Sequence, residues 1–212
     1  MTIACPLCYS LDTHHYFEDK MRSYRNCSVC QLIFVPEQYH VTNQVEKEIY
    51  DLHQNSPEDE GYRGFLNKLL IPLSQKLTPQ AHGLDFGCGS GPTIKPMLEA
   101  QGFKVDNYDI YYYKQEKLLL KKYDFITTTE AIEHFNQPRK ELELLDSLLR
   151  SGGYLGIMTK RPTNLEAFSR WHYKNDQTHI CFFSEKTFYW IANLFNYDIE
   201  FPGSDTVILQ KL

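Results

Sequence analysis

Long apolar runs are missing from this 212-residue chain, and no stretch of about 18 apolar residues is available to span a bilayer. The N-terminus carries Cys5, Pro6 and Cys8 where a secretory signal needs an unbroken apolar core. Excess positive charge is also absent: the formal net charge is -5, which argues against a protein that mainly coats nucleic acid. We therefore expect a cytoplasmic protein without membrane partners, and its 42% apolar residues suffice for a substantial core.

The chain has only six cysteines, and four of them form a pattern. They stand as two C-x-x-C pairs, Cys5 with Cys8 and Cys27 with Cys30. Two such pairs can present four thiolates to one tetrahedral zinc ion. Two disulfides are the alternative, but they would not persist in a reducing cytosol. The spacing therefore predicts a structural zinc site in a ribbon over residues 1-36, with no coordination position open to a substrate.

A glycine-rich segment follows an expected strand near the middle of the chain. Gly87, Gly89 and Gly91 have no Cβ atoms, so backbone N–H groups in this turn can approach a ligand closely. In nucleotide-binding folds, an acidic residue about 20 residues after such a loop ends the next strand and accepts hydrogen bonds from the ribose hydroxyls. Asp109 stands at this distance from the loop. The segment therefore predicts a nucleotide pocket.

The spacing of these glycines distinguishes between cofactors. A dinucleotide fingerprint reads G-x-G-x-x-G, whereas residues 85-91 read D-x-G-x-G-x-G. This pattern resembles the first motif of the class I S-adenosylmethionine-dependent methyltransferases, whose loop wraps the amino-acid end of the cofactor. Residues 130-135, which begin E-x-x-E-H, resemble the segment after the fourth strand in many small-molecule methyltransferases, and residues 149-153 resemble the Gly-Gly turn before the fifth strand. The likeness covers residues 60-212.

The resemblance implies a fold, a cofactor and a set of contacts. The fold is α/β, a Rossmann-like methyltransferase sheet that is mostly parallel and closes with an antiparallel C-terminal hairpin, joined to the small N-terminal zinc ribbon. The implied cofactor is S-adenosylmethionine. Its expected contacts are Asp85, Gly87, Cys88, Gly89, Gly91, Asp109, Ile110 and Glu130.

The order of expected elements agrees with this fold, because strands that alternate with helices indicate a parallel sheet covered on both faces. Strands are expected at 83-87, 103-109, 123-129, 153-160, 198-202 and 205-211, and helices at 92-101, 138-150 and 185-196. Apolar residues also recur at helical spacing from Val41 to Leu52 and from Leu66 to Leu77. We divide the chain into a zinc ribbon (1-36), a helical connector (37-80) and a methyltransferase domain (81-212).

One connection is shorter than the family pattern. Only Ile110 to Lys122 separate Asp109 from the next strand, which leaves room for about one helical turn and a vestigial edge strand near Leu118 to Leu120. The acidic residue that usually contacts the adenine is therefore unassigned. Tyr111 to Tyr113 either stack on the adenine or cover the truncated sheet edge, and the sequence leaves both open.

Methyl transfer requires in-line alignment, exclusion of water and, for a hydroxyl acceptor, removal of a proton. Histidine titrates near neutrality, so His179 and His134 are the candidate bases. For each of them, a structural histidine hydrogen-bonded to the backbone is the alternative. Asp176 is placed to orient His179 if the intervening turn brings them together.

The acceptor is not identified by the sequence. A small molecule is the leading hypothesis, because motifs expected for amino methylation of adenine or glutamine and for cytosine C5 methylation are absent. RNA is the alternative, and the ribbon residues offered for its contact are Lys20, Arg22, Tyr24 and Arg25. A catalytically inactive interaction protein on the same fold is a third hypothesis. A nicotinamide-dependent oxidoreductase is disfavoured by the missing G-x-x-G step.

Overall fold

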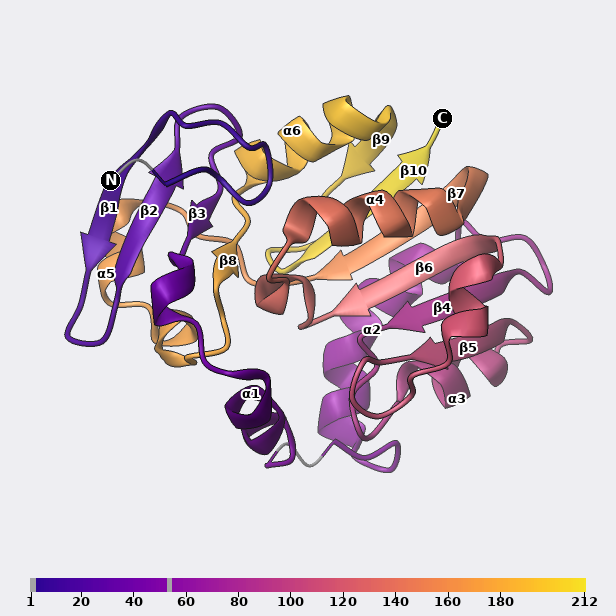
Figure 1. The fold of residues 1–212 in the computed structure, drawn as a ribbon. Helices are drawn as coiled ribbons and strands as arrows, with labels where there is room; N and C mark the ends of the chain where they lie inside the picture. Colours follow the sequence, from indigo (N-terminus) through magenta and orange to yellow (C-terminus); the bar gives the residue numbers. More distant parts are fainter. Residues whose placement is uncertain (1–2, 53–54) are drawn as a thin grey trace.

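The computed structural model describes residues 3–52 and 55–212 (Figure 1). A six-stranded sheet has the strand order β5-β4-β6-β7-β10-β9, and a four-stranded sheet has the order β1-β2-β3-β8. Within the described residues, no helix has the length and apolar character needed to cross a membrane.

The large sheet has the architecture expected of the methyltransferase fold. Its strands are β4 (His82–Phe86), β5 (Lys104–Tyr108), β6 (Tyr123–Thr129), β7 (Leu149–Met158), β9 (Tyr197–Glu200) and β10 (Thr206–Lys211). Strands β4 to β7 run parallel, and β10 pairs antiparallel with both β7 and β9. The predicted fold class is therefore confirmed.

Helices cover both faces of this sheet. They are α2 (Glu60–Ser74), α3 (Ile94–Glu99), α4 (Pro138–Leu148) and α6 (Glu185–Phe195). Leu69 of α2 and Leu98 of α3 share one core with Phe125 of β6, while Leu145 of α4 shares the other core with Ile126. Neighbouring residues of a strand face opposite ways, so Phe125 and Ile126 enter different layers. Figure 1 accordingly shows α4 in front of the sheet and α2 behind it.

Gly83 of β4 makes room for the neighbouring strand. A Cβ atom at Gly83 would lie 2.2 Å from two atoms of the Phe125 ring. We expect Gly83→Ala to lower the free energy of unfolding by about 1–3 kcal/mol, because extra volume in a packed core forces side chains to shift. Denaturant unfolding measures the change. Gly64→Ala in α2 is the matched control: an added Cβ there meets nothing within 4 Å. Equal destabilisation by both variants would contradict the packing argument.

The N-terminal ribbon shares its sheet with a distant part of the chain. Its own strands are β1 (Thr13–Glu18), β2 (Ser23–Cys27) and β3 (Ile33–Phe34), and β8 (Cys181–Phe182) pairs antiparallel with β3. The ring of Phe168, in α5 (Leu165–Ser169), packs edge-on against Tyr24 with centroids 5.2 Å apart. The division into residues 1-36, 37-80 and 81-212 stays a prediction, and one strand of the last segment completes the sheet of the first.

The connector begins with the 3-10 helix η1 (Glu37–Tyr39) and helix α1 (Asn43–Tyr50). The apolar spacing indicated a helix at this place, but its apolar residues do not form the buried face. Val45 and Leu52 are 40% and 78% exposed, whereas Glu46 is 8% exposed. The carboxylate of Glu46 is the buried group because tyrosine hydroxyls bind it, as described below.

The short connection after β5 contains no strand. Residues Glu116–Leu120 form the 3-10 helix η2, so the edge strand expected near Leu118 to Leu120 is wrong and β5 is the last strand of the sheet. The buried side chain of Leu118 turns inward, and its carbonyl accepts a 3.0 Å hydrogen bond from the Tyr123 hydroxyl. These contacts hold the segment against the start of β6. The remaining residues of the connection are too few to form another strand beside β5.

Candidate active site

A pocket of about 470 Å³ opens at the carboxyl ends of β4, β5 and β6. This is the sheet edge at which α/β proteins bind ligands, and the volume lies within the range of about 300–1,000 Å³ typical of small-molecule sites. The lining includes both candidate bases, His134 and His179. It also includes the expected cofactor contacts Asp85, Gly87, Cys88, Gly89, Asp109, Ile110 and Glu130.

The glycine loop wraps around the end of β5. Gly87 and Gly89 have φ values of 77° and 66°, in the left-handed region that side chains rarely adopt. The N–H groups of Gly87 and Cys88 both donate to the carbonyl of Tyr108, at 2.8 and 3.2 Å. Gly91 serves a different purpose, because a Cβ there would lie 2.1 Å from the backbone oxygen of Asn55. The loop therefore needs glycine for its own turn and for the approach of a neighbouring segment.

Asp109 joins the glycine loop to the turn after β5. Its Oδ2 accepts a hydrogen bond from Gly89 N–H at 3.0 Å. Its Oδ1 accepts from Tyr111 N–H at 2.8 Å and Tyr112 N–H at 3.1 Å. The carboxylate is 9% exposed and lines the pocket. The ribose contact stays a prediction. The sequence did not indicate that Asp109 also holds the glycine loop against the turn after β5 through these backbone contacts.

Asp85 lies beneath the loop with 2% of its surface exposed. Its Oδ1 accepts a 2.9 Å hydrogen bond from the Thr127 hydroxyl. Burial, opposed by the Thr127 hydrogen bond and assisted by the nearby Asp109 charge, raises the pKa of Asp85 to about 7. The carboxyl is therefore protonated in mildly acidic solution.

This shift gives a pH dependence of stability. Between the pKa of an unfolded aspartate, about 4, and the folded value of about 7, the folded state holds a proton that the unfolded state has lost. The contribution of Asp85 is complete below pH 4 and is lost as the pH rises to 7, with a slope of at most about 1.4 kcal/mol per pH unit. We expect Asp85→Asn to remove this slope in urea unfolding at pH 5 and pH 8. An unchanged profile would contradict the assignment, and Asp198→Asn on the exposed part of β9 is the control.

Two glutamates meet at the base of the pocket: Glu130 lines it, and Glu133 is fully buried behind it. The hydroxyl of Tyr173 lies within hydrogen-bond distance of Glu133 Oε1 and, at 3.3 Å, of Glu130 Oε2. Burial raises the pKa of both carboxyls, and the neighbouring Glu130 raises that of Glu133 further. The other oxygens, Glu130 Oε1 and Glu133 Oε2, are buried without a hydrogen-bond partner. No role was predicted for Glu133, although the E-x-x-E-H spacing was the signal for it.

The candidate bases lie side by side, with ring centroids 4.7 Å apart. His134 ends the 3-10 helix η3 (Ile132–His134), and His179 precedes β8. Nδ1 of His134 lies 3.1 Å from the carbonyl oxygen of Thr178, and Nδ1 of His179 lies 2.7 Å from that of Tyr173. A carbonyl oxygen only accepts, so each Nδ1 carries the proton and a neutral ring keeps its lone pair on Nε2. Each histidine is therefore hydrogen-bonded to the backbone, as expected for a structural histidine, and each also lines the pocket.

Asp176 approaches His179 but does not hydrogen-bond its ring within the usual range. Its Oδ2 lies 3.8 Å from His179 Nε2, which is an ion-pair distance for a protonated ring. Its Oδ1 accepts from the N–H and hydroxyl of Thr178, at 2.8 and 2.6 Å. Asp176 therefore shapes the turn that carries His179.

A model of the family described as "Methyltransferase domain" matches residues 59–200. The chain belongs to this methyltransferase family. A search of curated proteins returned no match.

Three solved structures are similar to the methyltransferase, and the first of them has a TM-score above 0.5. The PH0226 protein from Pyrococcus horikoshii OT3 is 17% identical, with a TM-score of 0.52, and the match covers 78% of this chain and 99% of that one. The magnesium protoporphyrin IX methyltransferase from Synechocystis PCC 6803, solved with bound SAH, is 15% identical with a TM-score of 0.48 over 80% and 94%. A SAM-dependent methyltransferase from Thermotoga maritima is 15% identical with a TM-score of 0.47 over 73% and 96%.

Tyrosines after β5 tie α1 of the methyltransferase to the pocket. Glu46 of α1 accepts hydrogen bonds from the hydroxyls of Tyr50, at 2.8 Å, and Tyr111, at 2.7 Å. The Tyr112 hydroxyl donates to Asp51 at 2.7 Å. Helix α1 therefore covers one side of the pocket, while stacking of Tyr111 or Tyr112 on an adenine stays a prediction.

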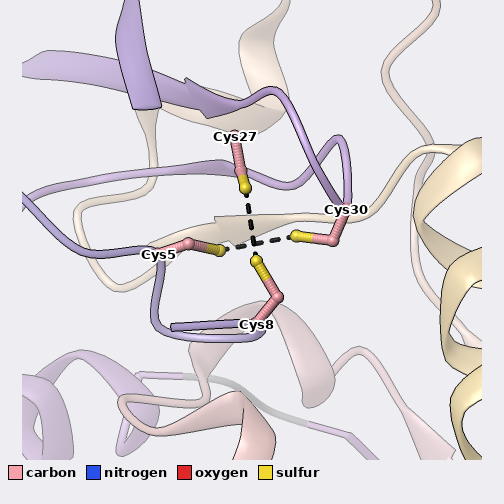
Figure 2. A group of neighbouring side chains, drawn as sticks. All are labelled: Cys5, Cys8, Cys27 and Cys30. Carbon is pink, nitrogen blue, oxygen red and sulfur yellow. Dashed lines mark hydrogen bonds between the residues drawn. The ribbon is translucent and has the colours of Figure 1, made fainter. Parts of the chain in front are cut away.

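The ribbon of the methyltransferase contains a four-cysteine cluster. The four side chains converge on one point from two loops (Figure 2). Sγ of Cys5 lies 3.4 Å from that of Cys30, and Sγ of Cys8 lies 3.3 Å from that of Cys27. A disulfide requires about 2.05 Å. Tetrahedral zinc at about 2.3 Å from each sulfur places the sulfurs about 3.8 Å apart. The donor set therefore fits a tetrahedral metal, and the disulfide alternative does not fit.

Arg22 supports the pocket from the ribbon side. Its guanidinium donates to the carbonyl oxygens of Lys174 at 2.6 Å, Asp176 at 2.7 Å and Gln177 at 2.9 Å. Arg22 is 5% exposed and Tyr24 is fully buried, so the prediction that these two residues contact RNA is wrong. The physical reason is that they fasten the ribbon to the turn that carries His179.

Proposed function

We propose that this methyltransferase domain transfers a methyl group from S-adenosylmethionine to a small-molecule acceptor. The observation that carries the proposal is that the glycine loop, Asp109 and the two histidines line one pocket. A cofactor contact and a group able to accept a proton therefore face the same space.

The residues fit S-adenosylmethionine. Gly87 and Gly89 present backbone without Cβ atoms, and Asp109 lies beside them as the proposed ribose contact. Glu130 Oε1 is a buried acceptor without a partner, suited to a positively charged group. The proposed holding residues are Asp85, Gly87, Cys88, Gly89, Gly91, Asp109, Ile110 and Glu130. The bound cofactor supplies an activated methyl group on a sulfonium.

His179 and His134 are proposed to take the proton of the acceptor. Both Nδ1 atoms face carbonyl oxygens, so the neutral rings offer Nε2 as the basic atom. Helix α1 supports this role, because Glu46 and Tyr50 line the pocket and limit the access of water. The edge-on contact of Tyr50 with the His134 ring, at 5.2 Å between centroids, positions that histidine.

The cysteine cluster is proposed to hold one structural zinc ion through Cys5, Cys8, Cys27 and Cys30. The spacing of the sulfurs supports this. Thiolate zinc sites are compatible with a reducing compartment, which supports the proposed cytoplasmic localisation. With Arg22 and Tyr24 buried, the ribbon offers RNA fewer contacts, and this favours the small-molecule acceptor.

Calorimetric titration and an acceptor screen test the proposal. We expect the purified protein to bind S-adenosylmethionine and not NAD, and to move a labelled methyl group into the small-metabolite fraction of an extract but not into its RNA. NAD binding would overturn the cofactor, and labelling confined to RNA would overturn the acceptor class. Cofactor binding without methyl incorporation in any fraction would favour the inactive interaction protein.

A further inference from the structure

The two histidines of the pocket lie beside a buried carboxylate. One oxygen of Glu133 and one ring nitrogen from each of His134 and His179 all lie within 4.8 Å of one another. Glu133 is fully buried and His179 is 8% exposed. We propose that Glu133, His134 and His179 bind a divalent first-row transition-metal ion at the base of the pocket. This site is separate from the four-cysteine cluster.

The hydrogen bonds of the histidines match those of metal ligands. Each ring directs Nδ1–H at a backbone carbonyl, of Thr178 for His134 and of Tyr173 for His179. Metal-binding histidines are commonly held by such a bond, which fixes the tautomer and aims the lone pair of the other nitrogen at the metal. Nε2 is therefore the coordinating atom of both side chains.

The carboxylate of Glu133 has the matching arrangement. Its Oε1 contacts the Tyr173 hydroxyl, whereas Oε2 is buried without a hydrogen-bond partner. Burying a carboxyl oxygen without a hydrogen-bond partner is unfavourable. A cation beside Oε2 removes this penalty. Tyr173 then holds the ligating carboxylate in place from the other side.

The ligand types select the ion. Imidazole nitrogens with a carboxylate suit manganese, iron, cobalt or zinc better than magnesium or calcium. Ligand atoms at about 2.1 Å from one ion lie about 3.0–3.4 Å apart, so the three side chains must move closer together to bind it. Three protein ligands leave coordination positions open, and both histidines line the pocket. An acceptor oxygen can therefore reach the ion from the pocket.

Metal binding and proton transfer use the same atoms. Nε2 of each histidine is the proposed basic atom for proton transfer and the proposed coordinating atom for the ion. The metal site shares the pocket of the proposed function but does not require methyl transfer, because ion binding is measured directly.

The test uses Mn²⁺, which prefers nitrogen and oxygen ligands and so avoids the thiolate cluster. The full-length protein loaded with zinc is titrated with Mn²⁺, and the free ion is measured by electron paramagnetic resonance. We expect one Mn²⁺ per chain beyond the zinc. Glu133→Gln and His179→Gln should each weaken binding by at least about 10-fold. His172→Gln, at an exposed histidine, is the matched control and should bind as the wild type.

Zinc content and thermal unfolding show that each variant is folded, and His179→Gln carries the test if Glu133→Gln does not fold. Absence of Mn²⁺ binding at millimolar concentration, or wild-type affinity in the folded variants, would overturn the metal site. Calorimetry with S-adenosylmethionine on the same samples separates the two proposals. Cofactor binding without Mn²⁺ binding removes only the metal site, and Mn²⁺ binding without cofactor binding removes only the proposed function.

Discussion

Asp109→Asn is expected to weaken the binding of S-adenosylmethionine by about 100-fold or more, which is about 2.7 kcal/mol. The asparagine keeps one acceptor oxygen for Tyr111 and Tyr112, but its amide group would face the N–H of Gly89, where Asp109 Oδ2 now accepts. Two donors then oppose each other, and the proposed ribose contact loses its charge. Hydrogen bonds to a charged group contribute about 1.5–3 kcal/mol each, so losing two of them accounts for the effect.

Isothermal titration calorimetry measures this change. Asp106→Asn in β5, the strand that precedes Asp109, is the matched control: its side chain contacts His82 and Lys121 rather than the glycine loop. We expect that variant to retain wild-type affinity. Wild-type affinity in Asp109→Asn would remove Asp109 from the cofactor site and leave it only the task of joining two turns.

Cys27→Ser is expected to release the metal and to lower the free energy of unfolding by several kcal/mol. Structural zinc contributes about 10–16 kcal/mol to the folding of zinc-finger peptides, so most of the ribbon's stability depends on the four ligands. Cys27 is fully buried and belongs to the core shared with β7 and α4. Destabilisation of the ribbon therefore reaches the large sheet.

Elemental analysis and thermal unfolding measure the outcome. Cys181→Ser is the matched control, because Cys181 is buried outside the cluster and its thiol contacts the Phe135 carbonyl at 3.4 Å, a bond that serine can also make. The control should keep one zinc per chain. A wild-type protein without metal, or a Cys27→Ser variant that retains it, would contradict the zinc assignment.

Loss of the ribbon should also impair the pocket, although the ribbon does not line it. Arg22 binds three carbonyl oxygens of residues 174-177, and Asp19 accepts a 3.2 Å hydrogen bond from Lys174. These contacts hold the turn that carries Asp176 and His179. The N-terminal module is therefore a support of the candidate active site, which explains why Arg22 and Tyr24 are buried.

Prediction succeeded where the signal was local. Residue spacing in the sequence was enough to predict three features: the C-x-x-C pairs, the glycine turn, and the alternation of strands and helices. Each of them depends on residues that are close together in the chain. The prediction of a strand near Leu118 to Leu120 was wrong. The length of the connection limits which elements can fit there, but it does not show that the side chain of Leu118 turns into the core. Helix α1 was indicated by its apolar spacing, but the buried side chain is Glu46, bound by a tyrosine hydroxyl from the turn after β5.

By itself, the sequence determined the fold class, the four cysteines that meet and the loop that faces the pocket, since glycine and cysteine act through backbone geometry and short spacing. Only the tertiary structure decided which distant groups meet. It placed β8 in the ribbon sheet, Arg22 on the turn before His179, and Glu133 beside the two histidines. Such contacts join residues far apart in the chain, and their geometry depends on how the whole core packs.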